Sequence, residues 1–131
     1  MSRGQLRPWN LDIMRSLIAV AQGKLEADLF FTGGHILDVY NGVLMEANLA
    51  VKGQRIAYLG QSDSMVGEST QVIDLEGRVL VPGYIEPHAH PFAMHHPVAF
   101  ADEVLSWGTT CSVNDNLLFM SLMSPDQIIT M

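Results

Sequence analysis

The stretch that decides the fold is VPGYIEPHAHP, residues 81–91. Its Pro-Gly pair is typical of a turn, and the residues after it are extended in character and end in His88-Ala89-His90. Side chains two residues apart in a β-strand point to the same face, so a strand over 84–90 presents both imidazoles together and turns Ala89 away. Because neutral imidazole binds Zn²⁺, Fe²⁺ and Mn²⁺, His88 and His90 are candidate ligands of one metal ion.

Two histidines are only part of a catalytic metal centre, which usually has at least three protein ligands and an open position for water. A bare His-x-His pair is more often an ordinary pair of strand or loop side chains. Glu86 precedes His88 by two residues and could orient an imidazole, or could instead meet solvent or a backbone amide. Asp115 follows the next predicted strand and could line the same site. His95 and His96 could lie at the site mouth, although a solvated loop is the more ordinary interpretation.

The sequence after Pro82-Gly83 predicts alternating strands and helices. A strand over 84–90 is followed by a helix over 98–107, a β-branched strand over 109–114, and a second helix that begins at Ser124-Pro125. This alternation is typical of βα units in a parallel sheet, and in a (β/α)₈ barrel the active residues lie at the carboxyl ends of the strands. The last helix has only about one turn before Met131, too short to be stable alone, so we expect a truncated barrel in a fragment of a longer protein.

The region before this stretch predicts a different architecture. Residues 27–81 contain short strands separated by turn residues, typical of a small antiparallel β region of sandwich or barrel type, and Asn41-Gly42 is its strongest hairpin signal. Residues 10–22 predict a short helix with Asn10 as its N-cap and one apolar face. That face consists of Leu11, Met14, Leu17, Ile18 and Ala21. The predicted class is α/β, with a helical extension over 1–26, a β domain over 27–81 and the start of a barrel over 82–131.

Composition excludes several classes of partner. Seven basic residues against fourteen acidic ones give a net charge of −7, which argues against binding to nucleic acid or to an anionic membrane. No apolar run approaches the roughly 20 residues of a membrane-spanning helix. A single cysteine, Cys111, permits no internal disulfide and no cysteine-based zinc site, and it is consistent with a reducing cytoplasm.

The segment VIDLEGRVLVPGYIEPHAHP, residues 72–91, resembles the signature with which metal-dependent amidohydrolases enter their barrel. Within that superfamily, GGHILDVYNG (33–42) and WGTT (107–110) are most similar to adenine deaminases, and the resemblance covers about residues 27–120. Two positions depart from the usual pattern. Glu86 stands where those enzymes commonly have Asp, and Asn114-Asp115-Asn116 stands where they commonly have Asp-Pro-His-Glu. The chain therefore resembles a divergent branch of adenine deaminases.

The resemblance implies hydrolytic deamination of adenine to hypoxanthine and ammonia, a step of purine catabolism, in a cytoplasmic homo-oligomer. It also implies a divalent metal cofactor, in the complete enzyme a binuclear Mn²⁺ or Fe²⁺ (or Zn²⁺) centre, with further ligands and catalytic residues expected beyond Met131. Two alternatives stay open from the residues. One is a different cyclic amidohydrolase, dihydroorotase-like or imidazolonepropionase-like. The other is a stand-alone, non-catalytic β-domain that binds a partner.

Overall fold

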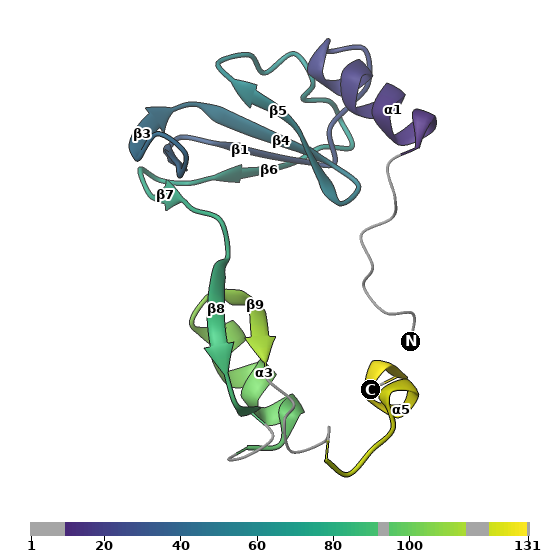
Figure 1. The fold of residues 1–131 in the computed structure, drawn as a ribbon. Coiled ribbons are helices and arrows are strands. Elements are labelled where there is room, and N and C mark those ends of the chain that lie inside the picture. Colours follow the sequence, from purple (N-terminus) through teal and green to yellow (C-terminus); the bar gives the residue numbers. More distant parts are fainter. Residues whose placement is uncertain (1–9, 92–94, 115–120, 131) are drawn as a thin grey trace. The chain divides into compact units, whose positions relative to one another are not determined.

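A computed structural model of the chain describes residues 10–91, 95–114 and 121–130. The chain divides into two compact units, with the boundary between Val81 and Pro82 (Figure 1). Within the described residues, no helix has both the length and the apolar character that crossing a membrane requires.

The first unit consists of one helix and two small sheets. One sheet has the strand order β5-β4-β1-β6 and the other has the order β3-β2-β7. The elements are α1 (Leu11–Ala21), β1 (Leu29–Thr32), β2 (His35–Asp38), β3 (Val43–Glu46), β4 (Asn48–Lys52), β5 (Arg55–Gly60), β6 (Gln71–Asp74) and β7 (Val79–Leu80).

Three long segments each pass from one sheet into the other. β1 continues into β2 through Gly33-Gly34, β3 continues into β4 through Ala47, and β6 continues into β7 through residues 75–78. The third corner needs a left-handed backbone, with φ of 51° at Glu76 and 80° at Gly77. Gly34 needs the absence of a side chain, because a Cβ there would lie 2.4 Å from the carbonyl oxygen of Arg78.

Residues 27–81 were predicted to form an antiparallel region. That prediction is wrong in part, because the strands pair in both directions. β1–β4, β2–β3 and β4–β5 are antiparallel, but β1–β6 and β2–β7 are parallel. Short turns return a strand antiparallel to its neighbour, as the predicted Asn41-Gly42 hairpin between β2 and β3 does. The loop over 61–70 instead brings the chain back to the start of β1, where the amide of Gln71 donates to the carbonyl of Asp28 at 3.0 Å. β6 therefore leaves in the same direction as β1.

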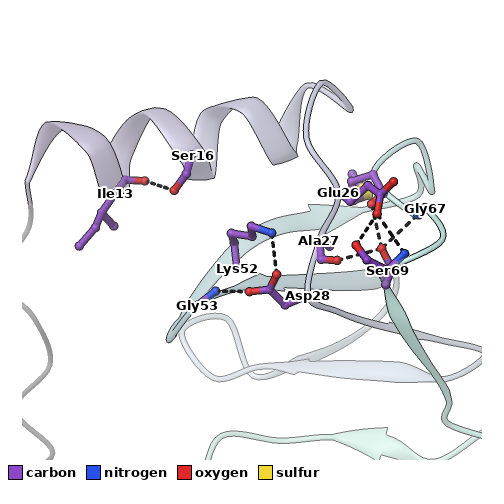
Figure 2. A network of polar contacts seen from close by, with 11 residues as sticks. Ile13, Ser16, Glu26, Ala27, Asp28, Lys52, Gly53, Gly67 and Ser69 are labelled. Carbon is purple, nitrogen blue, oxygen red and sulfur yellow. Dashed lines mark hydrogen bonds and ion pairs between the residues drawn. The ribbon is translucent and has the colours of Figure 1, made fainter.

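Side chains at the start of β1 hold this loop in place (Figure 2). The Glu26 carboxylate accepts from the Ser69 amide at 3.1 Å and from the Ser69 hydroxyl. The Thr70 hydroxyl donates to the carbonyl of Ala27 at 2.8 Å. These contacts hold the end of the loop beside the start of β1, and β6 therefore pairs with β1 in parallel.

The core of the first unit consists of two clusters of buried side chains. One contains Val20, Ala27, Phe30, Ala50 and Met65, and the other contains Ile36, Ala47 and Leu49.

Helix α1 begins and ends close to the predicted residues. The Asn10 side chain accepts from the amide of Ile13 at 2.8 Å as N-cap, and Gly23 follows the helix with a φ of 67°. The predicted apolar face is only partly correct. Leu17 is buried, but Leu11 and Ile18 are 68% and 53% exposed. The helix packs against β5 and β4, and its buried residues are Leu17 and Val20.

The second unit is one strand–helix–strand unit followed by a short helix. It contains β8 (Tyr84–Ala89), α3 (Pro97–Ser106), β9 (Thr109–Asn114) and α5 (Pro125–Thr130). β8 and β9 pair in parallel, as predicted, because a helix carries the chain back before β9 begins. Gly108, with a φ of 91°, follows α3, and the Gln127 side chain accepts from the amide of Ser124 at 2.9 Å before α5.

Candidate metal centre

The register of β8 against β9 is irregular at two places, between Tyr84 and Ile85 and between Glu86 and Ala89, and the second has the form of a β-bulge. Glu86 lies opposite Ser112 of β9 and Ala89 lies opposite Asn114, so three steps along β8 match two steps along β9. The irregularity falls at Pro87-His88, and Pro87 has no amide hydrogen to donate to a neighbouring strand. The amide of His88 donates to the Glu86 carboxylate at 3.1 Å. The strand ends at Ala89, one residue earlier than predicted, and His90 is the first residue after it.

Both imidazoles lie on one side of this strand end, as predicted. The two Nε2 atoms are 2.9 Å apart, and the rings meet edge to face with centroids 4.5 Å apart. At this distance one imidazole donates an N–H···N hydrogen bond to the other, and a metal ion bound by both Nε2 atoms would take the place of that proton. Two bonds of about 2.0–2.1 Å at the tetrahedral angle separate their nitrogens by about 3.3 Å, so a small shift of the exposed rings of His88 and His90 lets one ion bind both.

The other predicted site residues have different positions. Glu86 contacts the main chain of His88, which is the second of the two roles that its sequence position left open. Asp115 lies outside the described residues. His96 caps α3 by accepting from the amide of Val98 at 3.3 Å, and the amide of His95 donates to the carbonyl of Pro91.

No group of three or more His, Cys, Asp or Glu side chains in the described part of the chain could hold a metal ion. The described residues thus bring together two candidate ligands, the imidazoles of His88 and His90. The bulge that accompanies them was not predicted, although a proline inside a strand pattern is the signal that indicates one.

A hollow of about 400 Å³ in the first unit does not belong to this centre. It is lined by residues of α1, by Asp28 just before β1, and by residues of the β4–β5 hairpin, including Lys52. The Asp28 carboxylate accepts from Lys52 Nζ at 2.6 Å and from the amide of Gly53 at 2.7 Å (Figure 2). Lys52 and then Gly53 hold the pKa of Asp28 below its ordinary value. These polar groups bind one another across the hairpin and stabilise it.

Comparison with known proteins gives the family. No family model matches the chain. Adenine deaminase of Moorella thermoacetica is 39% identical over 105 residues, which cover 79% of this chain and 18% of that protein. Adenine deaminase of Kosmotoga olearia is 42% identical over 100 residues, which cover 76% of this chain and 17% of that protein. The chain thus spans about a fifth of the length of the relatives that it matches.

A solved structure supports the same assignment. D-aminoacylase, an amidohydrolase with a binuclear metal centre, is similar to this chain with a TM-score of 0.56 and 30% identity, over 69% of this chain and 19% of that one. The aligned region therefore has the fold of an amidohydrolase as well as its sequence motif. The chain belongs to the adenine deaminase family of the metal-dependent amidohydrolases.

Proposed function

We propose that this chain carries part of the metal centre of an enzyme that hydrolyses adenine to hypoxanthine and ammonia. His88 and His90 are two of the ligands of a divalent ion. The observation that carries the proposal is the 2.9 Å separation of the two Nε2 atoms, in a chain that is 39% and 42% identical to adenine deaminases.

The donor set and the charge of the second unit suit a divalent cation. Two neutral imidazoles bind Mn²⁺, Fe²⁺ and Zn²⁺, and we propose a binuclear centre of Mn²⁺ or Fe²⁺ in the complete enzyme. Residues 82–131 include carboxylates but no lysine or arginine, so the local field attracts a cation. A divalent ion bound here supplies Lewis acidity toward water and substrate. The histidines hold the ion in place, and its remaining ligands come from outside the described residues.

The second unit is proposed as the beginning of a (β/α)₈ barrel. β8, α3 and β9 form a parallel strand–helix–strand unit, and His88 and His90 lie at the carboxyl end of its first strand. That is the end of a barrel strand at which active residues lie. In this proposal, residues 27–81 are the small β domain that precedes the barrel, and residues 1–26 are a helical extension.

The likeness to D-aminoacylase favours a second candidate, hydrolysis of an amide in place of deamination. The two candidates share the metal centre and differ in the bond that is broken. One assay separates them, because deamination of adenine releases ammonia and hydrolysis of an acylated amino acid releases a carboxylate.

The test uses the protein expressed from its complete reading frame and loaded with Mn²⁺ or Fe²⁺. We expect ammonia from adenine, and little hydrolysis of an N-acyl-D-amino acid or of a cyclic amide. His88→Ala and His90→Ala should each lose more than the 10- to 100-fold that is typical of removing an outer partner of a ligand. His35→Ala, which changes a histidine of the first unit, is the matched control. Full activity in both ligand variants would show that the metal is bound elsewhere.

The 131-residue chain alone should release no ammonia from adenine above a metal-only control. Two imidazoles bind an ion without the further ligands that fix its geometry and acidify its water. Turnover by this chain would contradict the assignment of its histidines as one part of a larger centre.

A further inference from the structure

The contact between Glu86 and the main chain of His88 has no counterpart in regular strand pairing. A bulge places an extra residue on one strand, and the backbone groups of that residue lack their regular partners on the neighbouring strand. In β8 the bulge falls at Pro87-His88, and proline supplies no amide hydrogen. The Glu86 carboxylate accepts the amide hydrogen of His88 at 3.1 Å and so satisfies that donor from within the same strand.

This hydrogen bond acts on the residue that carries the first imidazole. It closes a short loop from the side chain of Glu86 to the backbone of His88, across the fixed φ of Pro87. The direction of the His88 side chain is set by that backbone, and its Nε2 lies 2.9 Å from the Nε2 of His90. Bulges beside active sites commonly re-aim a side chain in this way.

We propose that Glu86 is a positioning residue: its carboxylate holds the bulge that points the imidazoles of His88 and His90 at one ion. The inference rests on the proposed metal site. It differs from two other roles for a carboxylate two residues before a ligand, which are direct coordination and a hydrogen bond to the imidazole. The carboxylate contact that the structure shows is with the amide.

Titration of the metal-free protein, expressed from its complete reading frame, with Ni²⁺ tests the inference. Ni²⁺ stands high in the affinity order for nitrogen ligands. The heat of binding gives the affinity, and ¹H NMR of the imidazoles identifies the histidines that respond. The double variant His88→Ala/His90→Ala defines the signal of this site against that of the other histidines. Asp102→Asn removes one negative charge from α3 in the same unit and serves as the matched control for charge.

Glu86→Ala should weaken Ni²⁺ binding at this site by about three- to tenfold, which corresponds to the loss of one hydrogen bond. Glu86→Gln should stay within about twofold of the unaltered chain, because the amide oxygen of Gln can accept the same bond. Asp102→Asn should also stay within about twofold. Rescue by Gln separates positioning from coordination, since a neutral amide is a poor replacement for a carboxylate ligand.

Three other results are possible, and each would contradict a different part of the proposal. If Glu86→Ala binds Ni²⁺ as tightly as the unaltered chain, the inference fails while the metal site stands. If Glu86→Gln is as weak as Glu86→Ala, the charge of the carboxylate matters and the positioning role is wrong. If the unaltered chain binds no better than the double histidine variant, the proposed metal site itself fails.

Discussion

At the residue scale, single carboxylates connect parts of the first unit that are distant in sequence. Asp28, just before β1, binds both Lys52 and the amide of Gly53 in the β4–β5 turn. Glu26 binds Ser69 in the loop that returns to β6, and the two hydrogen bonds from Ser69 lower the pKa of Glu26. Asp38 caps the β2–β3 turn, where the side chain of Asn41 and then its amide lower the pKa of Asp38.

These lowered pKa values predict how stability depends on pH. A carboxyl group whose pKa is lower in the folded state stabilises the fold fully above its ordinary pKa, which is about 4. That contribution is lost as the pH falls through 4 toward the folded-state pKa, because the unfolded chain then binds more protons. The urea midpoint of the first unit should therefore be constant from about pH 7 to 5 and fall below that.

Asp28→Asn should reduce this dependence on pH. Asp28 is 48% exposed, so water screens its pair with Lys52, and the loss of stability at pH 7 should be about 1 kcal/mol or less. The difference between variant and unaltered chain should be smaller at pH 3 than at pH 7, because the contribution of Asp28 is lost as the pH falls below about 4 toward its folded-state pKa. Asp63→Asn, which removes the same charge from the loop over 61–70, is the control. An equal difference at pH 7 and pH 3 would exclude an ionic contribution from Asp28.

At the scale of the element, α1 shows that amphipathic spacing leaves the contact face of a helix undetermined. Leu17 and Ile18 are adjacent and similar in size, but Leu17 is 8% exposed and Ile18 is 53% exposed. Ile18 belongs to an exposed apolar row that also includes Leu11 and Met14. The side of α1 that contacts the β4–β5 hairpin carries Leu17 and Val20.

Two alanine substitutions in α1 test this orientation. Leu17→Ala should lower the free energy of unfolding of the first unit by about 2–3 kcal/mol, because it leaves a cavity against the sheet. Ile18→Ala should change it by no more than about 0.5 kcal/mol, as is usual at exposed sites. Both values come from urea denaturation followed by circular dichroism. Equal effects of the two substitutions would show that α1 packs through the other face.

At the scale of the whole molecule, the two units differ in their cores. The first unit has buried clusters around Phe30 and Ile36. In the second unit, Pro91 is the one buried residue among those whose side chains the structure describes. Large apolar side chains of that unit are exposed, among them Ile85 at 66% and Trp107 at 75%. Burial of apolar surface is the main stabilising term in folding, so the first unit has most of the stability of this chain.

Hydrogen exchange should reveal this difference in the 131-residue chain. Amides of β1 and β4 should exchange slowly, through cooperative unfolding of the first unit. Amides of β8 and β9 should exchange at least about a hundredfold faster, through local opening. Mass spectrometry of peptic peptides provides the measurement, and the same chain unfolded in urea provides the reference for fast exchange. Equal protection in β1 and β8 would show that the second unit is stable on its own.

The sequence by itself determined the features that depend on near neighbours in the chain. Asn10 caps α1 because its side chain reaches an amide three residues away. Asn41-Gly42 forms a hairpin turn, and the strand Thr109–Asn114 has the predicted bounds. Local geometry is sufficient for each of these, so the residue pattern predicted them.

Only the tertiary structure decided the features that depend on contacts between distant residues. β6 is parallel to β1 because the loop over 61–70 is fastened beside the start of β1. The buried side of α1 depends on where the β4–β5 hairpin lies. The bulge at Pro87-His88 depends on the register against β9, and it gives Glu86 a backbone amide as its partner. A local residue pattern does not specify these contacts. They form between segments that are far apart in sequence and come together only when the chain folds.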